Sequence, residues 1–70
     1  MNFSEALKAM KMGSKVSREA WRGLIAYYEI TKEPHTNTTV IKRFIPDGRN
    51  IIVSNIDIDD ILAEDWWLVT

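Results

Sequence analysis

The first apolar residues of the chain recur at intervals of three and four positions, the spacing that places side chains on one face of a helix. They are Phe3, Ala6, Leu7 and Met10. Asn2 stands before this run and Glu5 lies three residues later, which is the arrangement of a capping box. Gly13 follows the last turn, where a left-handed residue ends many helices. The pattern predicts an amphipathic N-terminal helix, which must pack against other elements to persist.

After this helix, apolar and polar residues alternate over short stretches, as they do in strands with one buried face. We expect strands over residues 15–18, 24–30, 39–45, 51–53 and 66–69. The stretch 18–23 reads as a turn-like connection that holds Trp21, and the polar stretch 31–38 reads as a loop because it contains Pro34. Pro46-Asp47-Gly48 predicts a hairpin turn, since proline presets φ and glycine accepts a positive φ.

A short helix is predicted just before the final strand. Asp57 can cap it with its side chain, and Asp59 and Asp60 fall in its first turn, where carboxylates suit the helix dipole. Its apolar side consists of Ile58, Ile61 and Leu62. The whole chain, residues 1–70, is expected to form one α+β domain with a small antiparallel sheet, an N-terminal helix and a short helix before the C-terminal strand.

The final strand carries adjacent tryptophans, Trp66 and Trp67. Successive side chains of a strand point to opposite faces of a sheet. Both faces must therefore be covered, one by the core of the domain and the other by a partner chain or a ligand.

The chain has 70 residues, no cysteine and a single histidine, His35. A domain of this length has a marginal core and usually needs a disulfide, a metal or a partner subunit. Without cysteine, disulfides and thiolate metal sites are excluded, and no cofactor or metal is expected. Oligomerisation, or a core rich in aromatic residues, is left to stabilise the fold.

Nine basic and ten acidic residues give a net charge of −1, which provides no general attraction to DNA, RNA or a membrane. The basic residues gather in the first and middle thirds and the acidic ones over 57–65. Such blocks are either solvated faces or a basic surface that holds an anionic ligand. The sequence shows neither a targeting signal nor an apolar run long enough for a membrane span, so a cytoplasmic protein is expected.

No catalytic residues are predicted. The acidic residues before and within the second helix suit capping better than acid–base chemistry, and His35 lies in a polar loop without a motif. Arg18 and Trp21 are three residues apart, and an indole with a guanidinium can sandwich a nucleobase and hold its phosphate. The alternative is that Trp21 fills the core while Arg18 pairs with an acid such as Asp65.

The two ends of the chain together carry a resemblance. The opening MNFSEALKAMKMGSKVSREAW has the pattern M-x-F-x-x-A-L, then G-x-x-V, then R-x-x-W, and the close DDILAEDWWLV is similar to a D-L-L-A-x-D-W ending. These motifs resemble the Thoeris anti-defense two family, which is found mainly in phages and prophages. They cover about half of the chain, in the expected order.

The resemblance implies an oligomeric sponge, a dimer or tetramer, in the host cell cytoplasm. It would sequester cyclic nucleotide signals of the Thoeris and CBASS immune systems, of the glycocyclic ADP-ribose type or cyclic oligonucleotides, without cleaving them. Ligands would sit at subunit interfaces. The motif positions are Arg18, Trp21, Asp60, Asp65 and Trp66. We expect ligand contacts from Trp21, Arg18, Arg22, Asp65 and Trp66, while Asp60, Asp65 and Trp66 also suit an architectural role.

The sequence departs from the family pattern just before the acidic helix. A Trp-x-Pro-Ser/Thr stretch is common there, but this chain has Ser54-Asn55-Ile56-Asp57, and its middle region is short. The resemblance therefore does not identify which nucleotide is bound. Two other functions are kept beside the sponge: a protein-interaction module that inhibits a host protein, and a small hydrolase or lyase acting on a nucleotide.

Overall fold

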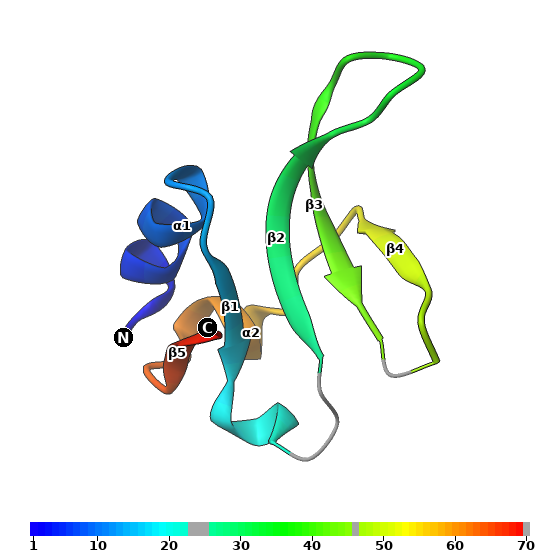
Figure 1. Ribbon diagram of the computed structural model, residues 1–70. Helices are drawn as coiled ribbons and strands as arrows, with labels where there is room; N and C mark the ends of the chain where they lie inside the picture. Colours follow the sequence, from blue (N-terminus) through cyan, green and yellow to red (C-terminus); the bar gives the residue numbers. More distant parts are fainter. Residues whose placement is uncertain (23–25, 46, 70) are drawn as a thin grey trace.

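The computed structural model describes residues 1–22, 26–45 and 47–69. It confirms the predicted α+β fold, in which two helices accompany a five-stranded antiparallel sheet (Figure 1). The elements in chain order are α1 (Phe3–Lys11), β1 (Lys15–Arg18), a short 3-10 helix η1 (Glu19–Trp21), β2 (Tyr27–Lys32), β3 (Thr39–Phe44), β4 (Asn50–Val53), α2 (Ile58–Leu62) and β5 (Trp66–Val69). No helix in these described ranges is long and apolar enough to cross a bilayer.

Helix α1 begins and ends as its sequence predicts. The Asn2 side chain accepts a hydrogen bond from the Glu5 amide at 2.9 Å, and the Glu5 side chain accepts one from the Asn2 amide at 2.9 Å. Gly13 ends the helix with φ 94°, and its amide donates to the Met10 carbonyl. Both caps satisfy backbone groups that a helix terminus would otherwise leave unpaired.

The strands lie in the order β4-β3-β2-β1-β5, so the C-terminal strand is at one edge and β4 at the other. The β2–β3 hairpin is longer than predicted, since Thr31 pairs with Val40 and Lys32 with Thr39. The polar residues Thr31 and Lys32 continue the hydrogen-bonded ladder where the hairpin extends away from the rest of the molecule (Figure 1). The loop between the two strands is therefore shorter than the predicted 31–38. At the other end of β2, Ala26 precedes the strand. Residues 24 and 25 of the predicted 24–30 strand, and residue 23 of the predicted connection, lie outside the described ranges.

Two smaller predictions need correction. Strand β3 ends at Phe44, and Ile45 instead begins the hairpin connection, where its amide donates to the Arg49 carbonyl at 3.1 Å. Asp57 occupies the N-cap position of α2, but its side chain makes no capping hydrogen bond. Its backbone carbonyl instead accepts from the amides of Asp60 and Ile61.

The register assigns the residues of the sheet to two faces, because paired residues lie on the same side. We call one the helix face. It contains Val16, Arg18, Tyr28, Arg43 and Trp66 and packs against Ala6 and Met10 of α1. The opposite face contains Lys15, Ser17, Tyr27, Phe44 and Trp67. Trp66 and Trp67 thus point to opposite sides, as expected from their alternation.

Candidate ligand-binding site

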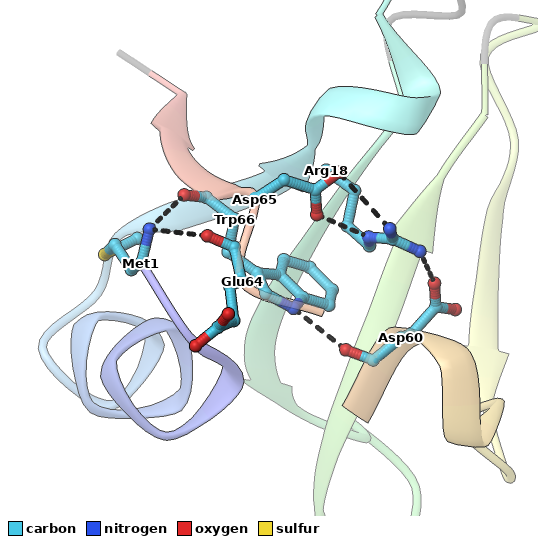
Figure 2. Close-up of polar contacts among 6 residues, drawn as sticks. All are labelled: Met1, Arg18, Asp60, Glu64, Asp65 and Trp66. Atoms are coloured by element: carbon cyan, nitrogen blue, oxygen red, sulfur yellow. Dashed lines mark hydrogen bonds and ion pairs between the residues drawn. The ribbon is translucent and has the colours of Figure 1, made fainter. Parts of the chain in front are cut away.

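Arg18 on the helix face is held between two carboxylates (Figure 2). Its Nε donates to Asp65 Oδ1 at 2.8 Å, and its Nη1 donates to Asp60 Oδ1 at 2.5 Å. The hydrogen bonds from Arg18 hold the pKa of the Asp65 carboxyl below its ordinary value, and the carboxylates in turn raise the pKa of Arg18. Because β1, α2 and the start of β5 meet at this one guanidinium, the cluster is a structural brace.

Trp66 completes the brace. Its indole Nε1 donates to the Asp60 carbonyl at 2.9 Å, and its side chain is only 2% exposed. The Met1 amine donates to the Trp66 carbonyl at 2.8 Å (Figure 2). The Trp66 amide in turn donates to the Met1 carbonyl. These bonds attach the first residue of the chain to the C-terminal strand.

Trp21 lies in the aromatic core at the end of β1. Its ring is 5.0 Å from the Tyr28 ring and 5.4 Å from the Trp66 ring, measured between centroids. The guanidinium carbon of Arg43 lies 4.9 Å from the Trp21 ring centroid, in cation–π geometry. Only 9% of Trp21 is exposed, so little of its ring is open to a ligand.

A pocket of about 200 Å³ opens beside Trp21, on the opposite face of the sheet. Residues from β1, β2, β5 and the connection after β1 line it. They are Ser17, Trp21, Arg22, Ala26, Tyr27, Trp67 and Val69. Most of this lining is apolar and aromatic, which suits a planar ring better than a sugar or a metal ion.

Cations lie over the two half-buried rings of this pocket. The guanidinium carbon of Arg22 is 5.2 Å from the Trp67 ring centroid, and Lys15 Nζ is 5.1 Å from the Tyr27 centroid. Tyr27 also stacks on Phe44, with centroids 4.9 Å apart and an interplanar angle of 12°. The opposite face therefore offers aromatic surface and positive charge together.

The polar groups of the pocket differ in whether they are already paired. The Ser17 hydroxyl donates to the Ala26 carbonyl at 2.7 Å. Arg22 binds Glu19 through two hydrogen bonds of 2.6 and 2.7 Å, but both side chains are largely exposed. The Trp67 Nε1 is buried and has no hydrogen-bond partner in the described part of the chain. A buried donor without an acceptor is costly, and Trp67 is the lining residue of this pocket that carries one.

The structure divides the five ligand contacts expected from the sequence into two groups. Trp21 and Arg22 lie at the pocket, whereas Arg18, Asp65 and Trp66 lie in the brace. The pairing of Arg18 with Asp65, which was the alternative to phosphate binding, is present. Sequence reasoning did not name Tyr27 or Trp67 as site residues, although the alternation of Trp66 and Trp67 indicates that one of them faces away from the core.

Residues that could hold a metal ion do not gather in the described ranges, where no group of three or more His, Cys, Asp and Glu side chains is found. His35 lies in the exposed loop between β2 and β3. The chemistry of the site is therefore that of an aromatic pocket with flanking cations.

Comparison with known proteins gives one family. A model of the Tad2-like, or Thoeris anti-defense 2-like, domain matches residues 1–69. No curated protein matches the chain. The match covers nearly all of the sequence, including both terminal motifs, and supports a Thoeris anti-defense role. The chain belongs to the Tad2-like family of Thoeris anti-defense domains.

Proposed function

We propose that the protein is an anti-defence sponge that captures a cyclic nucleotide immune signal and keeps it intact. The observation that carries this proposal is the pocket between Tyr27 and Trp67, where aromatic rings, a flanking arginine and an unpaired buried donor occur together. A nucleotide supplies the matching groups: a flat base, ring acceptor atoms and a phosphate.

The base would stack on Trp67 or Tyr27 rather than on Trp21. Both rings are partly exposed, while Arg43, Tyr28 and Trp66 surround the Trp21 ring. Stacking of a base on an aromatic side chain contributes about 1–3 kcal/mol. Trp21 then forms the end wall of the pocket and fixes how far the base can enter.

Arg22 is placed to exchange partners when the ligand arrives. Its ion pair with Glu19 is exposed to solvent, and exposed pairs contribute little to stability. Moving the guanidinium from this carboxylate to a phosphate therefore costs little, and a phosphate accepts the same two-pronged hydrogen bond. Lys15 adds a second cation beside Tyr27.

The size of the pocket supports binding by more than one copy. Sites for whole drug-sized ligands enclose about 300–1,000 Å³, whereas this pocket encloses about 200 Å³. One chain can thus hold a single ring, and the rest of a cyclic dinucleotide-sized ligand needs further surface. A homo-oligomer, dimer or tetramer, would supply it.

Capture without cleavage agrees with the lining of the pocket. The described residues that line it include neither a carboxylate nor an imidazole, and the Ser17 hydroxyl donates to a backbone carbonyl. Among these lining residues a bound phosphodiester would therefore meet cations but no general base, and the carboxylate partner of Arg22, Glu19, lies outside the lining.

Calorimetric titration with a panel of cyclic nucleotides, including glycocyclic ADP-ribose isomers and cyclic dinucleotides, tests the proposal. We expect at least one to bind, to be recovered whole after denaturation, and to bind at least tenfold more weakly to Trp67→Ala. Leu68→Ala, which removes the next side chain of β5 from the other face, is the matched control and should bind normally. Absence of binding across the panel, or conversion of the ligand, would overturn the proposal.

A further inference from the structure

Asp47 and Gly48 form the one Asp-Gly pair of the sequence. The other two glycines follow Met12 and Arg22, and every other Asp or Asn precedes a residue that has a side chain. The amide nitrogen of the residue after an aspartate can attack the carboxyl carbon of that aspartate, and a side chain on the attacking residue hinders the approach. By sequence, this pair is therefore where the backbone is most open to isomerisation.

The pair lies in the exposed turn between β3 and β4. The Asp47 side chain is 49% exposed, and Gly48 is also exposed. Gly48 has φ 90°, and a side chain built there would meet no atom within 4 Å. Water and empty space therefore surround the atoms that would form and reopen a ring.

Hydrogen bonds in the turn occupy both reacting groups. The Arg49 amide donates to Asp47 Oδ1 at 3.0 Å, and Arg49 Nε donates to Asp47 Oδ2 at 2.6 Å. The Gly48 amide donates to the Ile45 carbonyl at 3.0 Å. The carboxylate is thus held toward residue 49, and the attacking nitrogen is held toward residue 45. Both sets of bonds must open before the nitrogen can reach the carboxyl carbon.

We propose that Asp47–Gly48 is a site of spontaneous isoaspartate formation, and that Arg49 limits its rate in the folded protein. The Gly48 nitrogen loses its proton and bonds to Cγ of the protonated Asp47 carboxyl, whose hydroxyl leaves as water. The product is a five-membered cyclic imide. Water then reopens the imide at either carbonyl. Cleavage of the bond from nitrogen to Cγ restores aspartate, and cleavage of the original peptide bond gives isoaspartate.

Isoaspartate would change the hairpin but not the nucleotide pocket. It adds one carbon to the main chain and leaves a free α-carboxylate, so the bonds of Ile45 with Gly48 and Arg49 lose their geometry. Pairing of β4 with β3 should weaken as a result. None of the residues that line the pocket beside Trp67 comes from this hairpin. The proposal is therefore independent of the proposed function, and the two can fail separately.

The exposure of the Arg49 contact sets the size of the expected effect. The two side chains are 73% and 49% exposed, and an exposed ion pair contributes little free energy. Its loss should therefore raise the population of open, reactive turns by only about two- to fivefold. Arg49 slows the reaction and does not prevent it, so the wild type should also accumulate isoaspartate.

Peptide mapping by mass spectrometry, with electron-transfer fragmentation to distinguish isoaspartate from aspartate, follows the reaction during long incubation of the folded chain. Position 47 of the wild type should convert, and Arg49→Ala should convert about two- to fivefold faster. Arg22→Ala is the matched control, because it removes another exposed pair, with Glu19, far from the turn in sequence, and it should keep the wild-type rate. Asp47→Glu should not convert, since its ring would need an additional atom.

The same measurement in concentrated urea separates the contact from the local sequence. In the unfolded chain the contact is absent, so the wild type and Arg49→Ala should convert at nearly equal rates. Absence of isoaspartate at position 47 in the folded wild type and Arg49→Ala, or equal folded-state rates for Arg49→Ala and Arg22→Ala, would overturn the proposal. A rate difference of the same size in urea would also overturn it. Should Arg49→Ala fail to fold, Arg49→Gln replaces it and is expected to show the same acceleration.

Discussion

Trp66 and Trp67 are neighbours in β5 but have opposite environments. The Trp66 Nε1 donates to the Asp60 carbonyl inside the brace, whereas the Trp67 Nε1 is buried at the pocket with no acceptor in the described part of the chain. The same kind of side chain thus holds the fold together at one position, and at the next it lines the pocket with its donor unpaired. Substitutions at the two positions should separate stability from binding.

The conservative substitutions Trp66→Phe and Trp67→Phe test this separation. Trp66→Phe leaves the Asp60 carbonyl without its donor and should lower the free energy of unfolding by about 1–3 kcal/mol. Trp67→Phe keeps a ring in the pocket and loses an unpaired donor, so stability should change much less, while affinity for a nucleotide should fall. Urea unfolding and calorimetric titration of both variants measure the two effects, and equal losses of stability would contradict the assignment.

The brace should make Arg18 more important for stability than the other arginines. Arg18→Ala leaves the largely buried Asp60 carboxylate unpaired, which should cost about 1–3 kcal/mol. Arg22→Ala removes only an exposed pair with Glu19 and should change the free energy of unfolding little. Thermal unfolding of the two variants makes the comparison, and a larger effect at Arg22 would show that the brace is unimportant.

The brace also predicts how stability depends on pH. Because hydrogen bonds from Arg18 lower the pKa of Asp65 in the folded state below its ordinary value of 3.8, the folded protein holds fewer protons than the unfolded chain as the pH approaches that value. The stability from this group is therefore present above the ordinary pKa and is lost as the pH falls through the folded-state pKa. Urea unfolding from neutral pH down to strongly acid pH should show this loss, and Asp65→Asn should reduce it. Asp59→Asn serves as the control, and an equal flattening by both would count against the brace.

Gly13 ends α1 in a left-handed conformation, with φ 94°. A side chain at this position meets no neighbouring atom, so the cost of Gly13→Ala is conformational alone. It should lower the free energy of unfolding by about 1–2 kcal/mol. Ser14→Ala, at the next residue, should have a smaller effect. Thermal unfolding would refute this expectation if the two variants had equal stability.

Local patterns were sufficient to predict most of the fold. The capping box at Asn2, the hairpin turn at Gly48 and the alternation of Trp66 and Trp67 each depend on residues close in sequence, and the structure contains all three. The prediction that the Asp57 side chain caps α2 was wrong. At this N-cap position the backbone carbonyl alone accepts the amides of the first turn.

The site was less predictable because it depends on pairing between distant strands. Tyr27 and Trp67 reach one pocket only because β1 lies between β2 and β5 in the sheet, an order that no local pattern contains. The nearness of Arg18 and Trp21 in sequence suggested one binding unit. In the structure, Arg18 turns to Asp60 and Asp65, while Trp21 extends from the core to the pocket.

The most direct test of the nucleotide pocket is the indole N–H signal of Trp67 in a ¹⁵N–¹H correlation spectrum, assigned with Trp67→Phe. A cyclic nucleotide that binds should shift this signal strongly, as its donor gains an acceptor, while the Trp66 indole signal stays nearly in place. A bound nucleotide that leaves the Trp67 signal unmoved would contradict binding at this pocket.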